Sequence, residues 1–285
     1  MHKIYGGVEI GGTKTICAIG HADGRLLAHK TIPTTSVEET LLAVNRFFEG
    51  QAPVAALGVG SFGPLNLHKL SEDYGSIHNS PKPGWTKVDL KTRLGDHFKV
   101  PIEFDLDVNC AALGELYFGV AKDVDSFVYL TFGTGVGGSL VINKEIIHGI
   151  LNLEMGHMRI PYTPSKAFKG VCKYHGDCLE GIASGYAMQQ KYGQPAEGIY
   201  SEKIWDEEAD YIALAINNII MTVGPQKIVL GGGLTHHSSL IERVRLKLRS
   251  TIDNYLSLPN LDTYIVASSG DLNGVLGAIK LSRRS

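Results

Sequence analysis

The sequence predicts an α/β fold of two lobes that repeat one plan, with a cleft between them. Strand patterns joined by glycine turns open the chain, and a similar run of strands begins again after Gly119. Each run leads to a segment of helical periodicity and then to a further buried strand. The chain has 285 residues, more than one usual domain, and no low-complexity linker, which fits two closely packed lobes.

In the first half, we expect a meander of strands at 3–10, 15–19 and 26–31. A helix follows, because Ser36 and Glu39 form a capping box and the apolar residues after them recur at helical spacing as far as Gly50. The remaining elements of this half are strands at 54–60 and 100–104 and a helix at 109–117.

In the second half, we expect strands at 126–132, 138–142 and near 146–147. The clearest helix starts near Asp206, carries isoleucines on one face and ends at Gly224. A strand at 227–230 comes next, and a C-terminal helix within about 272–285 is expected to return to the first lobe. The first lobe is therefore placed at 1–118 with this helix, and the second lobe at 119–271.

The composition excludes several classes of function. It has 44% hydrophobic and 20% charged residues and a net charge of −2, as ordinary globular proteins do. No charge excess points to nucleic acid or an anionic membrane, and no apolar run approaches the roughly 20 residues of a membrane span. The first residues run straight into a strand pattern without a signal-peptide core. We expect a cytoplasmic protein that binds neither nucleic acid nor membrane.

Glycine-rich turns follow predicted strands at 9–15, 133–138 and 231–233. Glycine lets backbone N–H groups approach a phosphate closely, although each turn alone could be a tight hairpin. The pattern G-x-G-x-x-G occurs at 133–138 and 58–63, but a strand pattern follows Gly138 where a dinucleotide-binding unit needs a helix. Lys14 does not follow a glycine, so the first turn is not a Walker A motif. A nucleotide site built from several hairpins is the remaining interpretation.

The chain resembles the ROK sugar kinases in three segments, which are EIGGTK at 9–14, TFGTGVGG at 131–138 and IVLGGG at 228–233. The resemblance covers the whole chain and implies a ribonuclease H-like fold of the actin and hexokinase superfamily. It also implies ATP and Mg²⁺, with Glu9 helping to hold the hydrated metal, although many relatives have Asp there. The residues implied at the phosphates and adenosine are Gly11, Gly12, Thr13, Lys14, Thr131, Gly133, Thr134, Gly135, Gly231 and Gly232.

Asp107 is the candidate catalytic base. Phosphoryl transfer to a sugar needs a group that accepts the hydroxyl proton, and a carboxylate between a strand and a helix suits this role. Taken alone, Asp107 is more simply a helix cap. The segment DLDVNCAALGE at 105–115 is similar to the family block whose Asp takes the sugar proton. Leu106 replaces an Asn that binds a sugar hydroxyl in glucose-type relatives, which favours the bacterial zinc-containing fructokinase type.

The sugar contacts are implied by the same resemblance. The loops GSFGPL at 60–65 and PKPGW at 81–85 look like the sugar-end loops of the fructokinase type, although turn chemistry alone explains their Pro and Gly. The segments EMGH at 154–157 and CLEG at 178–181 match family segments whose Glu and His contact sugar hydroxyls, although each Glu alone could be an exposed charge. The implied substrate residues are Ser61, Gly63, Pro64, Asp107, Glu154, His157 and Glu180.

A zinc site is predicted by four possible ligands with the spacing H-x14-C-x2-H-x2-C. They are His157, Cys172, His175 and Cys178, within an inserted segment at 157–178. Four such ligands can close a tetrahedron around Zn²⁺. Chance and a disulfide are the alternatives, and a cytosolic chain disfavours the disulfide. Because protein would fill all positions, the metal should be structural and should keep the nearby sugar-binding carboxylates in place.

These predictions favour an ATP-dependent kinase that phosphorylates D-fructose to fructose 6-phosphate. The alternative among enzymes is a broader ROK hexokinase that acts on mannose, glucose or an N-acetylated hexose, and Leu106 argues against it. A sugar-sensing repressor would carry a helix-turn-helix domain before the first phosphate segment, where only a few residues precede Glu9. A non-catalytic sugar-binding protein would not need Asp107 with all the phosphate segments. The family resemblance also implies a homodimer.

Overall fold

The computed structural model describes residues 3–80, 82–162 and 168–284. Pro81 of the predicted sugar-end loop and residues 163–167 of the predicted zinc segment lie outside this part. The chain divides into two compact units. Unit 1 is made of Met1–Lys122, Ile150–Asn152 and Gly270–Ser285, and unit 2 of Asp123–Gly149 and Leu153–Ser269.

Unit 1 is built on a five-stranded sheet with the order β3-β2-β1-β4-β7. The first three strands form an antiparallel meander, and β4 and β7 continue the sheet parallel to β1. Their bounds are β1 (Tyr5–Ile10), β2 (Lys14–Gly20), β3 (Leu26–Pro33), β4 (Leu57–Ser61) and β7 (Ile102–Leu106). The other elements are α1 (Val37–Glu49), β5 (Ser76–Ile77), β6 (Val88–Asp89), α2 (Leu90–Phe98), α3 (Asp107–Phe118) and α9 (Asn273–Leu281).

Unit 2 repeats this plan, because its sheet has the order β10-β9-β8-β11-β12. Again a meander is followed by two strands parallel to its first strand. The strands are β8 (Phe127–Phe132), β9 (Val136–Ile142), β10 (Glu145–Ile146), β11 (Lys227–Gly231) and β12 (Ile265–Ala267). The helices are α4 (Leu179–Ala183), α5 (Gly185–Tyr192), α6 (Glu202–Val223), α7 (Leu240–Ile252) and α8 (Leu261–Tyr264). The matching order of the two sheets confirms the predicted duplication.

The strongest local signals form the expected elements. Ser36 caps α1 by accepting the N–H of Glu39, and the apolar residues after it are buried on one face. The isoleucines of α6 are buried in the core of unit 2. Gly224 ends this helix in the left-handed conformation and donates its N–H to the carbonyl of Ile220.

Several predicted boundaries are wrong by a few residues. Strand β4 starts at Leu57 and not at Val54. The residue before Val54 is Pro53, which has no N–H to donate to a sheet. Helix α3 starts at Asp107, two residues before the expected Asn109, and strand β9 starts at Val136, which shortens the glycine turn before it. The first segment of unit 1 extends to Lys122, and the predicted lobe boundary at residue 118 stays a prediction.

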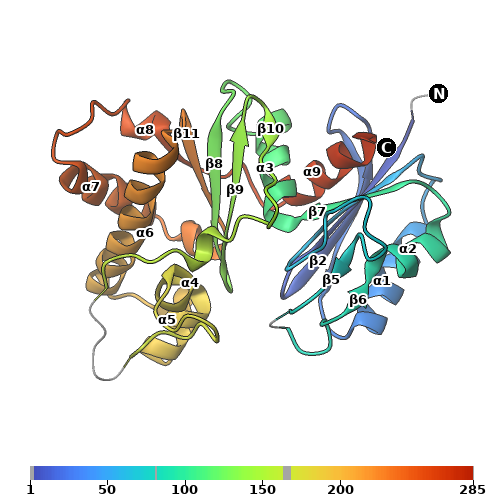
Figure 1. Ribbon diagram of the computed structural model, residues 1–285, viewed down its shortest axis with the longest axis horizontal. Coiled ribbons are helices and arrows are strands. Elements are labelled where there is room, and N and C mark those ends of the chain that lie inside the picture. The colour runs from blue at the N-terminus through green and yellow to red at the C-terminus, as the bar shows by residue number, and fades with distance from the viewer. Residues whose placement is uncertain (1–2, 81, 163–167, 285) are drawn as a thin grey trace. The chain divides into compact units, whose positions relative to one another are not determined.

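Helix α9 comes late in the sequence but belongs to unit 1, where it packs on α3 and β1 (Figure 1). Glycines let the two helices approach closely. A Cβ on Gly277 would lie 1.7 Å from the carbonyl oxygen of Cys110, and one on Gly114 would lie 2.1 Å from that of Asn273. The side-chain amide of Asn273 also donates to the buried carboxylate of Glu115, at 2.6 Å. This contact fixes the start of α9 against α3.

Each unit has its own hydrophobic core. The core of unit 1 contains Trp85 and that of unit 2 contains Trp205, with exposed fractions of 0% and 2%. These are the two tryptophans of the chain.

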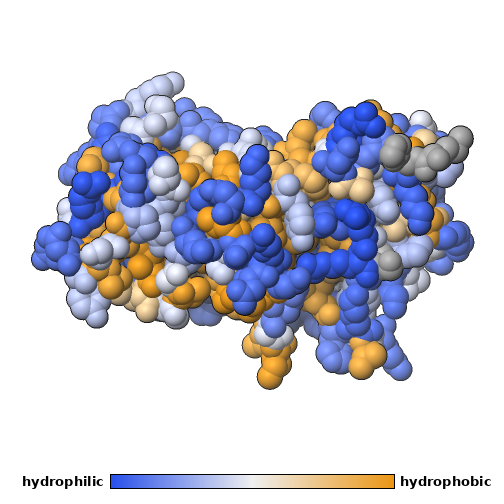
Figure 2. All heavy atoms as spheres, turned by 90° about the horizontal axis from the view of Figure 1, so that it is seen from above, coloured by the Kyte–Doolittle hydropathy of each residue, from blue (hydrophilic) through white to orange (hydrophobic). Residues whose placement is uncertain are grey.

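The face drawn in Figure 2 mixes hydrophilic and apolar side chains. Among the residues that the structure describes, no helix has both the length and the apolar character of a membrane span.

Candidate functional site

The predicted site residues of unit 1 meet at one edge of its sheet. Ile10 pairs with Ser61, and Ser61 pairs with Leu106, so the parallel strands β1, β4 and β7 end side by side. Just beyond these ends lie the Gly11–Lys14 turn, the Gly63-Pro64 loop and Asp107. Ligands of α/β folds commonly bind at the carboxyl ends of parallel strands.

Asp107 is the first residue of α3 and keeps partial exposure. It is not the N-cap, because Leu106 holds that position with an extended backbone. The Asp107 Oδ1 atom accepts the N–H of Val108 at 2.9 Å. Burial raises the pKa of Asp107 to about 6, although backbone N–H groups of Val108 and Asp107 act in the opposite direction. The carboxylate is therefore ionised near neutral pH and basic enough to accept a proton.

Glu9 lies near the end of β1, against the start of α9. A Cβ on Gly274 would lie 2.2 to 2.4 Å from the Glu9 carboxyl atoms, so only glycine leaves room for this carboxylate. Burial, together with Asp107, raises the pKa of Glu9 to about 8, while Lys14 acts to lower it. The Oε2 atom is buried and has no hydrogen-bond partner in the described part of the chain. Such an acceptor fits a cation or a water held by a cation.

The first phosphate turn joins β1 to β2. The N–H of Gly11 donates to the carbonyl of Lys14 at 3.0 Å, and the N–H of Thr34 donates to the carbonyl of Thr13 at 2.9 Å. The side chain of Lys14 is half exposed, and its Nζ lies 3.5 Å from Asp271 Oδ2. Among the described residues, no atom lies within 4 Å of a Cβ added to Gly12, so they leave this side of the turn open.

The predicted sugar-end loop continues from β4. Ser61 is fully buried, and its hydroxyl donates to the carbonyl of Phe62 at 3.1 Å. The peptide bond between Gly63 and Pro64 is cis, and the carbonyl of Pro64 accepts the N–H of His78 at 2.9 Å. The loop is therefore tied to its surroundings, while a sugar contact of Ser61 stays a prediction.

In unit 2, the glycine segments implied at the nucleotide also end neighbouring parallel strands. Thr131 of β8 pairs with Gly231 of β11. Gly133, Thr134 and Gly135 form the turn after β8, and the N–H of Gly185 donates to the carbonyl of Gly133 at 2.8 Å. Gly232 has φ of +88°, and a Cβ there would lie 2.4 Å from the carbonyl oxygen of Phe132. This position accepts only glycine.

Glu180, implied at the sugar, contacts the second phosphate turn. It lies in the first turn of α4, and its Oε2 accepts the N–H of Val136 at 3.1 Å. Glu154 is exposed and precedes the short 3₁₀-helix Met155–His157, whose last N–H donates to the Glu154 carbonyl at 2.9 Å. The sequence did not indicate that Glu180 braces a phosphate turn, because the two segments are 44 positions apart.

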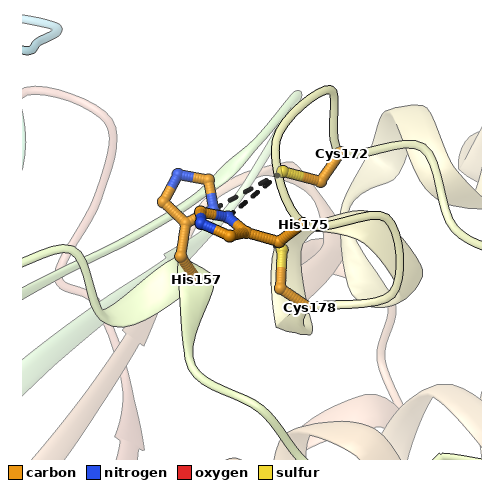
Figure 3. Close-up of side chains that lie close together, drawn as sticks. All are labelled: His157, Cys172, His175 and Cys178. Carbon is orange, nitrogen blue, oxygen red and sulfur yellow. Dashed lines mark hydrogen bonds between the residues drawn. The ribbon is translucent and has the colours of Figure 1, made fainter.

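The structure brings the four predicted metal ligands together, and their side chains point toward one another (Figure 3). Their ligand atoms all lie within 4.8 Å of one another. His157 Nδ1 lies 3.5 Å from Cys178 Sγ and 3.7 Å from Cys172 Sγ, and His175 Nδ1 lies 3.7 Å from Cys172 Sγ. A tetrahedron with bonds of about 2.0 to 2.3 Å has edges of about 3.3 to 3.8 Å, so these separations fit Zn²⁺. Both cysteines are free, which excludes the disulfide.

The metal ligands come from two segments that hydrogen bonds hold together. Cys172 and Gly176 exchange backbone hydrogen bonds of 3.2 and 2.9 Å, which close the loop around His175. The N–H of Leu179 donates to the carbonyl of Met158 at 3.0 Å, which joins this loop to the segment of His157. The same region leads directly into α4 and Glu180.

Sequence reasoning missed the part that α9 plays at the phosphate turn. Asp271 faces Lys14, and Gly274 and the N–H of Val275 lie at the carboxylate of Glu9. The sequence presents this segment only as a helix start. Its place beside β1 depends on a contact between segments more than 250 positions apart, which no local pattern reports.

Comparisons with known proteins show the family of the chain. The profile of the ROK family matches residues 5–285. A fructokinase from Pediococcus pentosaceus is 39% identical over 282 residues, which are 98% of each chain. A fructokinase from Streptococcus mutans is 37% identical, over 100% of this chain and 99% of that protein.

Solved structures share the fold. A ROK family glucokinase from Streptomyces griseus, in complex with glucose and AMPPNP, superposes with a TM-score of 0.81 over 100% of both chains at 23% identity. This likeness confirms the predicted fold of the hexokinase type.

Proposed function

The chain belongs to the ROK family, and from this premise we propose that it is an ATP-dependent fructokinase that converts D-fructose to fructose 6-phosphate. The observation that carries the proposal is identity of 37 to 39% with fructokinases over nearly their whole length. The strand ends of unit 1, which gather the phosphate turn and Asp107, supply the chemistry that such an enzyme needs.

Asp107 acts as the general base on the attacking hydroxyl. Its pKa of about 6 leaves it ionised at neutral pH, and a value near the working pH suits proton transfer. It accepts the proton of the 6-hydroxyl of fructose as the oxygen attacks the γ-phosphorus of ATP. The N–H of Val108 at Oδ1 holds the carboxylate in a fixed orientation.

The phosphate turns position the nucleotide. Backbone N–H groups of Gly12 and Thr13 and the ammonium of Lys14 are suited to contact phosphate oxygens, and the turn Gly133–Gly135 has backbone N–H groups of the same kind. Gly231 and Gly232 flank the adenosine. Glu9, with its unpartnered buried oxygen, would help hold hydrated Mg²⁺. When bound, Mg²⁺ neutralises charge on the leaving diphosphate.

The four Cys and His ligands would hold a structural Zn²⁺. With Nδ1 of His157 on the metal, its Nε2–H is left to donate to a sugar hydroxyl, beside Glu154 and Glu180. A metal bound by these four ligands would keep the three residues in place, because the ligands belong to the segments on either side of them. It takes no part in the proton transfer.

We also propose a cytoplasmic homodimer. The free cysteines of the chain support a reducing compartment. The dimer is supported by the family resemblance, and analytical ultracentrifugation checks it.

The test is ADP release measured with a panel of hexoses, namely fructose, mannose, glucose and N-acetylmannosamine. Fructose should give the largest kcat/KM. Asp107→Asn should lower kcat by about 10²- to 10⁴-fold, the usual contribution of a general base. Asp125→Asn is the matched control, because Asp125 is exposed and pairs with Lys144.

Two results would contradict the proposal in different ways. Preference for another hexose would favour the broader hexokinase. Wild-type turnover by the Asp107→Asn variant would show that Asp107 is not the general base, although the protein would still be a kinase.

A further inference from the structure

Lys82 reaches the first phosphate turn from a separate loop of unit 1. Its Nζ donates to the carbonyl of Gly12 at 2.8 Å, although the two residues are 70 positions apart. Gly12 is the open residue of the turn as far as the described residues go, since none of their atoms lies within 4 Å of an added Cβ. A second lysine, besides Lys14, therefore lies at this turn.

The backbone of Lys82 is fixed on both sides. Its N–H donates to Ser80 Oγ at 3.0 Å, and its carbonyl accepts the N–H of Trp85 at 3.2 Å. Trp85 is fully buried, and its Nε1–H donates to the carbonyl of Thr35 at 2.9 Å. The ring of Phe62 packs edge-on against the Trp85 ring, with centroids 5.2 Å apart. A buried anchor thus directs Lys82 at the turn.

The contact with Gly12 does not by itself account for this arrangement. Ordering a lysine side chain costs conformational entropy, and this cost is similar in size to what one hydrogen bond from a charged group contributes. An ammonium has three N–H donors, and the hydrogen bond to Gly12 uses one. The others can serve an acceptor that binds at the open side of the turn.

The charge balance at the turn calls for such a cation. The carboxyl groups of Asp107 and Asp271 lie close enough to Glu9 to raise its pKa, so acidic groups gather in this region of unit 1. Lys14 is engaged in part by Asp271, 3.5 Å away. The phosphate groups of a nucleoside triphosphate add further negative charge, and their transfer depends on cations around the phosphate oxygens.

We propose that Lys82 is a further phosphate-binding residue, which holds the Gly12 carbonyl and donates to the terminal phosphates of a nucleoside triphosphate. The inference rests on the proposed function, since it names a residue of the same phosphate site. Lysine suits the role because its ammonium is a compact point charge that binds phosphate.

The test compares Lys82→Met, Lys82→Gln and Lys82→Arg in the full-length, metal-loaded enzyme. Lys87→Met is the matched control, because Lys87 is an exposed lysine five positions further along the same loop. Isothermal titration with MgATP and with AMP, without sugar, measures binding. Lys82→Met should weaken MgATP by roughly 10- to 100-fold, the effect of one hydrogen bond to a charged group. AMP, which lacks the terminal phosphates, should bind with unchanged affinity.

The other two variants test whether MgATP binding needs the charge of Lys82 or only its hydrogen bond to Gly12. Lys82→Gln can still donate to Gly12 but has no charge, so we expect it to behave as Lys82→Met. Lys82→Arg should stay within about fivefold of the wild type, and all variants should melt within about 2 °C of it. MgATP affinity of Lys82→Met equal to that of Lys87→Met would overturn the inference. Wild-type affinity of Lys82→Gln would also overturn it, because Lys82 would then be only a tether.

The outcome is distinguishable from failure of the proposed function. If no hexose stimulates ADP release by the wild-type enzyme, the fructokinase proposal fails, whereas the titrations with MgATP still decide the role of Lys82.

Discussion

Asp107, the proposed base, lies at a helix start where burial of its carboxylate works against stability. Burial removes water from its carboxylate, which destabilises the charged form. The hydrogen bond from the N–H of Val108 offsets only part of this effect. A carboxyl group with a raised pKa is proton-bound over a wider range of pH than an ordinary aspartate, so the active form requires a pH above its pKa.

The pH dependence of catalysis follows from this value. We expect kcat/KM for fructose to fall about tenfold per pH unit below about pH 6, because protonated Asp107 cannot accept the hydroxyl proton. Steady-state kinetics between pH 5 and 8 measure this, and circular dichroism confirms that the protein stays folded. A flat profile over that range would assign the proton transfer to another group.

Two adjacent carboxylates of α6 should affect stability in opposite ways. Glu208 is buried, its Oε1 has no hydrogen-bond partner in the described part of the chain, and burial raises its pKa to about 8. Burial also acts to raise the pKa of Glu207, but hydrogen bonds from Lys191, Tyr211 and Tyr192 hold it below its ordinary value.

The sign of each effect follows from proton binding. The folded protein binds the Glu208 proton more tightly than the unfolded chain does. The contribution of Glu208 to the free energy of unfolding therefore falls as pH rises from about 4.5 to about 8. Glu208→Gln should therefore raise Tm at pH 8 by roughly 2 to 6 °C, and by less at pH 5. Glu207→Gln, the neighbouring control, should lower Tm at both values. Thermal melts at the two pH values check both signs.

The candidate site was predictable as far as its chemistry is local in sequence. The metal ligands have a compact spacing, and the structure places all four together. Asp107 and the glycine turns follow strands and so could be expected at a sheet edge. The contacts of Lys82 with Gly12 and of Gly274 with Glu9 could not, because each joins distant segments through packing.

At the scale of elements, helices α3 and α9 pack so closely where they cross that an added side chain would clash with backbone. Gly277→Ala would place a Cβ 1.7 Å from the Cys110 carbonyl oxygen, and backbone cannot move away cheaply. We expect a loss of about 1 to 3 kcal/mol or more in the free energy of unfolding. Urea denaturation gives the value.

Gly95→Ala is the matched control, since Gly95 also lies inside a helix but an added Cβ would meet nothing within 4 Å. It should raise the free energy of unfolding by about 0.5 to 1 kcal/mol, because alanine is the better helix former. Equal effects of the two substitutions would mean that the close approach of α3 and α9 carries no energetic weight.

The sequence predicted the meander strands and the helices α1 and α6, and even the two-residue strand β10, but it did not predict α7 or several short strands. The meander strands, α1 and α6 have enough residues to show their period. Strands β5 and β6 have two residues each, and β12 has three, so no period exists to detect. These strands form because neighbouring backbone offers hydrogen bonds.

At the scale of the whole molecule, each unit has one buried tryptophan, which makes the two cores separately observable. The four Cys and His residues that would bind zinc all lie in unit 2. Removing a structural metal takes its binding free energy away from the part of the fold that it holds.

We therefore expect a zinc chelator to lower the melting temperature of unit 2 more than that of unit 1, and to abolish turnover of sugar. Trp85→Phe leaves Trp205 as the fluorescent reporter of unit 2, and Trp205→Phe leaves Trp85 for unit 1. The two variants are melted with and without chelator. Equal shifts of the two reporters, or full activity without metal, would contradict a zinc that braces unit 2.

Because α9 follows unit 2 in the sequence, the ribosome makes this helix of unit 1 after it has made unit 2. Unit 2 is translated before the Gly270–Ser285 segment that completes unit 1. While α9 of a nascent chain is still inside the ribosome, the Glu9 carboxylate lacks its contacts with Gly274 and with the N–H of Val275. Unit 2 can thus complete its core while unit 1 still lacks the segment that packs against Glu9.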